Sequence, residues 1–174
     1  MKAKKIKYVS IFVLGMVVIG ISCFIIKISP LLGGILPPPG SKKMESYFLM
    51  DSQNMVYVSG YLKNLNYDDI RIDENDGNNQ MYVSNDDEGG QDIFIEESKL
   101  KEHINALYEH GFGVIEKHNN YVQFSKWSSL DSSRGIVCSF TDDEPLMEDV
   151  IELTPLSAEH WYYYEHNREK SERN

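Results

Sequence analysis

Carboxylates are abundant in this sequence, and hard cations such as Ca²⁺ take oxygen ligands. The densest run consists of three neighbours: Asp86, Asp87 and Glu88. A regular calcium loop is excluded, because a loop counted from Asp73 needs Gly at its sixth position and Glu at its twelfth, and Asn78 and Ser84 stand there. The three carboxylates are therefore candidates for an irregular Ca²⁺ site only, and the alternative is a solvated acidic loop. No spacing among the other acids singles out a catalytic pair.

The usual motifs for nucleophilic and metal-dependent catalysis do not occur. Cys138 lies between Val137 and Ser139 in an apolar run, where a thiol normally packs as a small hydrophobic side chain. The five histidines form no H-E-x-x-H pattern, and His103 and His110 are about two helical turns apart, too far to share an ion readily. The sequence thus predicts no catalytic residue, no cofactor and no metal site beyond the carboxylates above, and it favours a protein that is not an enzyme.

The aromatic run Trp161-Tyr162-Tyr163-Tyr164 is the one candidate for a recognition surface, because aromatic side chains are enriched at binding sites. In an alternating strand, Trp161 and Tyr163 face one side and the next two tyrosines the other. We take Trp161 and Tyr163 as binding-surface candidates, with packing of one pair into the core as the expected alternative.

The stretch Tyr8–Ile28 is predicted to be a transmembrane helix. Nineteen residues between Lys7 and Lys27 contain no charge, Pro, Asn or Gln, and at about 1.5 Å per residue they match the hydrocarbon core of a bilayer. A cleavable signal peptide would have a shorter apolar region and a small-residue cleavage site. A lipoprotein signal ending at Cys23 would stop the apolar run there, whereas this run continues. Both alternatives stay open, and the membrane span is preferred.

The flanking charges orient this span. Four lysines precede it, and the nearby bases beyond it are fewer, so the positive-inside rule places the N-terminus in the cytoplasm. The expected location is the cell membrane, as a single-pass protein whose C-terminal domain is extracytoplasmic.

The rest of the chain is strongly acidic. Residues 41–174 carry 12 Lys and Arg against 27 Asp and Glu, a formal net charge of −15. Nucleic-acid binding is excluded as an expectation, because it depends on neutralising phosphates with cations. The partners that such a domain attracts are cationic, above all a basic protein or peptide, although solubility alone also explains the charge.

Composition divides the chain into five parts: a cytoplasmic tail (1–7), the transmembrane helix (8–28), a Pro/Gly-rich linker (29–44), an acidic domain (45–167) and a flexible tail (168–174). The expected fold class of the domain is α+β, a small antiparallel sheet with one principal helix.

The helix is predicted at Lys99–His110, with Ser98 as its N-cap and Gly111 as its left-handed stop, because apolar residues recur there at helical spacing. The Asn119-Asn120 pair predicts a hairpin between Phe112–His118 and Tyr121–Trp127, with φ > 0 at the asparagines. Further strands are expected at the following ranges: Ser46–Met50, Met55–Tyr61, Met81–Ser84, Asp92–Glu96, Gly135–Phe140 (central) and His160–Glu165, with Leu146–Leu153 a strand or irregular.

Three functions fit these features. The first is a membrane-anchored interaction domain without enzymatic activity. The second is a small extracytoplasmic hydrolase that uses acids the sequence does not single out. The third is an accessory or inhibitory, immunity-like protein that neutralises a basic partner through its acidic surface.

Overall fold

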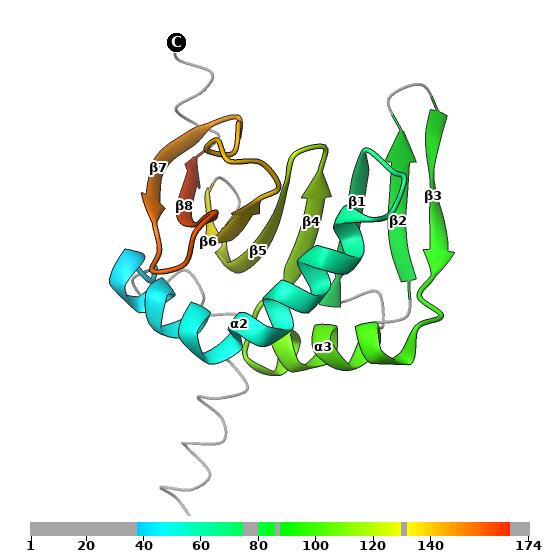
Figure 1. The fold of residues 1–174 in the computed structure, drawn as a ribbon, viewed down its shortest axis with the longest axis horizontal. Helices are drawn as coiled ribbons and strands as arrows, with labels where there is room; N and C mark the ends of the chain where they lie inside the picture. The colour runs from blue at the N-terminus through cyan, green and yellow to red at the C-terminus, as the bar shows by residue number, and fades with distance from the viewer. Residues whose placement is uncertain (1–37, 75–79, 86–87, 130–131, 168–174) are drawn as a thin grey trace, which may run out of the picture. The chain divides into compact units, whose positions relative to one another are not determined.

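The computed structural model describes residues 38–74, 80–85, 88–129 and 132–167 (Figure 1). The predicted cytoplasmic tail, transmembrane helix and C-terminal tail, and most of the predicted linker, lie outside these residues. Within the described part of the chain, no helix combines the length and apolar character needed to cross a bilayer. The membrane span is therefore still a prediction from the sequence.

The described residues form an eight-stranded antiparallel sheet in the order β3-β2-β1-β4-β5-β6-β8-β7. Its strands are β1 (Asp69–Asp73), β2 (Gln80–Asn85), β3 (Glu88–Phe94), β4 (Val114–His118), β5 (Tyr121–Ser128), β6 (Ser132–Ser139), β7 (Val150–Pro155) and β8 (Trp161–Asn167). The α+β class and the antiparallel sheet are confirmed.

Two helices, α2 (Ser41–Lys63) and α3 (Ser98–Glu109), pack against each other and against one face of the sheet (Figure 1). Alternate strand residues point toward the helices and are buried, as Ile70, Ile72 and Ile115 show. The main core joins them to helix residues, including Phe48 and Ile104. The opposite face of the sheet carries no helix among the described residues.

Helix α2 corrects the strands predicted at Ser46–Met50 and Met55–Tyr61. Their aromatic and β-branched content favours strands locally, but the residues that α2 buries recur at helical spacing, among them Met44, Phe48 and Met55. Burial of that stripe outweighs strand propensity. The described part of the domain thus has two helices, not one principal helix, and α2 begins inside the range predicted as linker.

Helix α3 confirms the predicted helix, with Leu100, Ile104 and Leu107 buried on one side. Its N-cap is Glu97, so Ser98 is the first helical residue and not the cap. Gly111 has φ 81°, as expected of a left-handed stop.

The predicted hairpin is present as β4 and β5, and His118 pairs with Tyr121 across a two-residue turn. The expected positive φ at the two asparagines is wrong, because neither Asn119 nor Asn120 has one. Instead the Asn120 carbonyl accepts a hydrogen bond from the backbone N–H of Phe140, at 2.8 Å. The turn is therefore held by the loop after β6.

Strand β6 confirms a central strand in GIVCSF, since it pairs with both β5 and β8. Strand β1 was missed, because its sequence DIRID reads as part of an acidic loop. Its Ile70 and Ile72 are buried, while Asp69, Arg71 and Asp73, which alternate with them, face outward. This outward row forms part of the site described next.

Candidate binding groove

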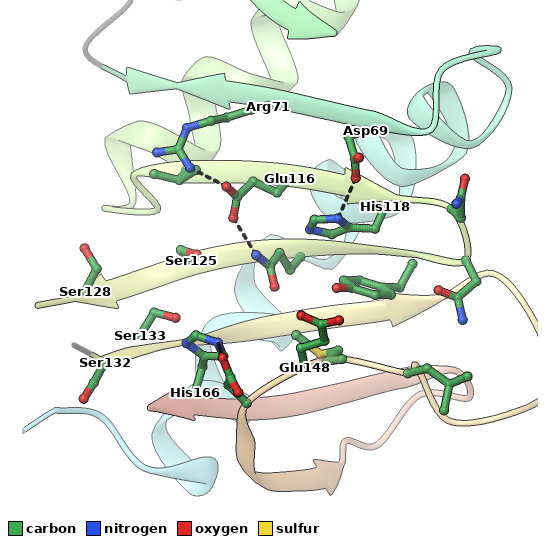
Figure 2. A pocket seen from close by; sticks show the side chains of 18 of the residues that line it. Asp69, Arg71, Glu116, His118, Ser125, Ser128, Ser132, Ser133, Glu148 and His166 are labelled. Atoms are coloured by element: carbon green, nitrogen blue, oxygen red, sulfur yellow. Dashed lines mark hydrogen bonds and ion pairs between the residues drawn. The ribbon is translucent and has the colours of Figure 1, made fainter. Parts of the chain in front are cut away.

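A groove of about 810 Å³ lies on the sheet face that carries no helix (Figure 2). It crosses β1, β4, β5, β6 and β8, and the segment 146–149 forms its rim. Since neighbouring strands are about 4.8 Å apart, the four intervals between these five strands give the groove a length of roughly 19 Å. Its lining is mostly polar: Asp69, Arg71, Val114, Glu116, His118, Asn119, Asn120, Tyr121, Gln123, Ser125, Ser128, Ser129, Ser132, Ser133, Leu146, Met147, Glu148, Asp149 and His166.

A guanidinium network crosses one end of the groove. Arg71 Nη1 donates to Glu116 Oε1, and Gln123 Nε2 donates to Glu116 Oε2 (Figure 2). Arg71 Nη2 also donates to Asp73 Oδ2 at 3.0 Å. Partial burial by itself lowers the pKa of Arg71, but the charges of Glu116 and Asp73 and their hydrogen bonds outweigh it and raise that pKa above its ordinary value. Carboxylates on this face thus already hold one cation, supplied by the chain itself.

A carboxylate–imidazole pair lies beside that network. His118 Nδ1 donates to Asp69 Oδ1 at 2.7 Å (Figure 2), and the His118 ring packs on the Tyr121 ring with centroids 4.7 Å apart. Burial, followed by the charges of Glu116 and Asp69, raises the pKa of Tyr121 to about 12, so its phenol stays protonated at neutral pH. The carboxylate fixes the imidazole ring so that Nε2 is the nitrogen left for a ligand.

The floor is a second, smaller apolar cluster, made of Tyr121, Val137 and Tyr164, with Met147 packed on it. Tyr164 is fully buried, and its hydroxyl shares a 2.8 Å hydrogen bond with Ser125 Oγ. Burial raises the pKa of Tyr164. This floor is fixed by packing, and the polar groups stand on it.

The rim on the other side carries Glu148 and Asp149. Asp149 Oδ2 lies 3.9 Å from His166 Nε2, and Asp149 has φ 56°. Glu148 is exposed, and no described residue pairs with its carboxylate. In total the groove holds four carboxylates and one guanidinium, so its field favours cations.

Trp161 and Tyr163, the predicted site residues whose side chains the structure describes, do not line this groove. Asp86 and Asp87 are outside the described residues, and Glu88 begins the edge strand β3. Within the described ranges, no three His, Cys, Asp or Glu side chains are grouped to hold a metal ion. An irregular Ca²⁺ site at the acidic run is therefore still only a prediction.

The aromatic candidates are core residues. Trp161 is 6% exposed and Tyr163 fully buried, both in the cluster under the helices, with Phe48 and Trp161 ring centroids 5.0 Å apart. They present no recognition surface, because both side chains lie on the helix-covered side of β8, an interior strand. Cys138 is half-buried, and burial raises the pKa of its thiol to about 11, as expected of an unreactive packed cysteine.

Sequence reasoning missed the groove residues because they belong to strands far apart in the chain. One signal was available: in DIRID, charged residues alternate with isoleucine at the period of a strand. That pattern predicts a charged face but not which strands lie together.

The chain matches no protein-family model, no curated protein and no solved structure.

Proposed function

We propose that this chain is a single-pass, membrane-anchored binding protein whose extracytoplasmic domain holds a segment of a cationic protein or peptide in the groove. The observation that carries the proposal is the uncovered groove across five strands, lined by four carboxylates and one guanidinium. The membrane anchor rests on the sequence of residues 8–28 alone.

The dimensions of the groove suit an extended peptide. At about 3.3 Å per residue, a groove of roughly 19 Å accommodates about six residues. The serines of the β5–β6 end and the amides of Asn119 and Asn120 supply donors and acceptors for a backbone.

Arg71 supports the choice of a cationic ligand. Its guanidinium is held by Glu116 and Asp73 on the same face, so the geometry for holding arginine already exists there. Glu148 and Asp149 on the opposite rim are placed to receive a partner's Lys or Arg in the same way. Such exposed pairs contribute little energy each, and their main effects are steering and selectivity against anionic partners.

The test is binding of a synthetic peptide of alternating lysine and serine to the full-length chain in a non-ionic detergent, measured by fluorescence anisotropy. The informative variant combines Glu148→Gln with Asp149→Asn. Asparagine is chosen at position 149 because it tolerates the positive φ of that residue. The matched control combines Glu102→Gln with Glu109→Gln, two exposed acids of α3 on the other side of the sheet.

We expect the groove variant to weaken binding between about twofold and thirtyfold, from two pairs of roughly 0.2–1 kcal/mol each, and the control to leave it nearly unchanged. Binding should also weaken as salt rises. Equal losses in both variants would mean attraction to net charge without a site, and the proposal would fail.

A hydrolase is the second candidate, and the Asp69–His118 pair is the observation that favours it, because a carboxylate that orients an imidazole is a common general-base arrangement. Hydrolysis of p-nitrophenyl acetate by the full-length chain tests it. A hydrolase would lose this activity on His118→Asn and keep it on His166→Asn, and a wild-type rate equal to that of His118→Asn rules the candidate out.

A further inference from the structure

The outward side of α2 differs from the rest of the domain in charge. Nine residues of this helix are exposed, and none is acidic: Lys42, Lys43, Ser46, Leu49, Met50, Gln53, Val56, Gly60 and Lys63. Leu49 is 64% exposed, Met50 57% and Val56 55%. Leu49 and Val56 are seven residues apart, which places them two turns apart on one stripe.

Cations flank this apolar stripe at both ends, with Lys42 and Lys43 in the first turn and Lys63 in the last. Lys63 is exposed, and its Nζ also donates to the Phe140 carbonyl at 3.3 Å. The two acids of α2 do not contribute to it. Asp51 is buried, and the carboxylate of Glu45 accepts the backbone N–H of Ser157 at 3.3 Å. The exposed positions of α2 itself therefore carry no carboxylate, in a domain with 27 acids after residue 40.

The start of α2 also lies close in sequence to the predicted membrane span. The Pro38 carbonyl accepts a hydrogen bond from Arg134 Nη1 at 3.4 Å, which ties the chain to the domain there. From Ile28 to Pro38 the chain spans at most roughly 35 Å when fully extended. A span ending at Ile28 would thus hold the first turn of α2 within that reach of the lipid.

We propose that the exposed side of α2 rests on the surface of an anionic bilayer, with its lysines at the headgroups and Leu49, Met50 and Val56 at their boundary with the acyl chains. The proposal depends on the membrane anchor of the proposed function. Three lysines on an otherwise acidic domain bind an anionic bilayer only weakly. The short tether keeps the helix at a high local concentration near the lipid, and this makes the contact persist.

This placement has a consequence for the groove. Helices α2 and α3 cover one face of the sheet and the groove lies on the other, so contact between α2 and lipid turns the groove away from the bilayer. The groove is then open to a partner arriving from outside the membrane.

Single-cysteine probes on the full-length chain test the contact. Cys23 and Cys138 are replaced by serine, and an environment-sensitive fluorophore is attached at Val56→Cys on α2 or at Asp92→Cys. Asp92 is the matched control, because it is exposed on β3 and pairs with Tyr82, whose ring lies on the groove side of the sheet. Each chain is reconstituted in phosphatidylcholine vesicles with or without phosphatidylglycerol, and quenching by doxyl-labelled lipid is measured.

We expect the emission of the fluorophore at Val56→Cys to shift to the blue and to be quenched about twofold or more relative to Asp92→Cys. Both effects should occur only in vesicles that contain phosphatidylglycerol. Lys42→Glu combined with Lys63→Glu should remove that difference. Equal quenching at both positions on a chain that resists carbonate extraction overturns the α2 contact and leaves the anchor standing. Release by carbonate overturns the anchor and the contact together. A blue shift without lipid quenching, accompanied by Val56→Cys cross-linking between chains, would assign the stripe to a second copy and also overturn the contact.

Discussion

Gly135 is the position in the sheet where a single added methyl group should do most damage. It lies in β6 opposite Ser125 of β5 and Tyr164 of β8. A Cβ built there would lie 2.1 Å from the Phe124 carbonyl oxygen and 2.8 Å from Tyr164 Cε1. Neither neighbour can move freely, because Phe124 O is backbone and Tyr164 is fully buried.

The magnitude follows from those two contacts. Overpacking a well-filled site costs about 1–3 kcal/mol. Displacing Tyr164 also weakens its 2.8 Å hydrogen bond with Ser125, worth about 1 kcal/mol. Gly135→Ala should therefore lower the free energy of unfolding by about 2–4 kcal/mol and the melting temperature by about 10 °C.

Gly113→Ala is the matched control, because a Cβ there meets nothing within 4 Å and the residue lacks a positive φ. It should be neutral or stabilising by up to about 1 kcal/mol, through the entropy of the unfolded chain. Thermal unfolding of the full-length chain in detergent, followed by tryptophan fluorescence, compares the two variants, since Trp161 is buried in the core. If both variants melt at the same temperature, the close approach at Gly135 is not what limits the sheet, and the reasoning is refuted.

Three other predictions concern titratable side chains. Asp51 is fully buried, and its Oδ1 accepts a 2.6 Å hydrogen bond from the 41%-exposed His110 and a longer one, at 3.4 Å, from Asn54 Nδ2. His110→Ala removes the shorter bond from a buried carboxylate and should cost about 2–4 kcal/mol, whereas Asp51→Asn should cost about 1 kcal/mol. Chemical denaturation that ranks the two variants the other way contradicts this asymmetry. The pKa of Tyr121 is about 12 in the folded chain, so above pH 10 the unfolded chain loses the phenol proton first. The free energy of unfolding should therefore fall by up to about 2 kcal/mol between pH 10 and 12. Denaturation midpoints should show a less steep fall in Tyr121→Phe. In a Cys23→Ser chain, the thiol of Cys138, with its pKa of about 11, should react with iodoacetamide at pH 8 about 100-fold more slowly than the thiol of free glutathione does. A comparable rate would show that the Cys138 thiol is not buried and that its pKa is not raised.

The sequence indicated those parts of the fold that short-range patterns specify. The helix near residue 100 was predicted because Leu100, Ile104 and Leu107 recur at helical spacing within a single element. The β4–β5 hairpin was predicted because its two strands adjoin a two-residue turn. In both cases the information lies within about fifteen residues, so no distant part of the chain was needed.

Helix α2 failed that kind of prediction for a physical reason. Its residues Tyr47, Phe48, Val56 and Val58 favour strands, and the polar group at 51–54 resembles a turn. Only the packing of Phe48 and Met55 on the sheet, and of Asp51 against His110, makes the helix the better structure. Asp51 and His110 are 59 positions apart, and Phe48 packs on Trp161 still farther along the chain, which local propensity does not register.

The sequence by itself determined the acidity of the domain, the apolar stretch at residues 8–28 and the lack of a local catalytic motif, because composition and short spacing express these directly. Tertiary structure alone decided that Asp69, Glu116 and Glu148 share one groove while Trp161 and Tyr163 lie in the core. The reason is that strand order, which places β1 beside β4 and β8 beside β6, is set by packing the whole of one sheet face against the helices and not by any one segment.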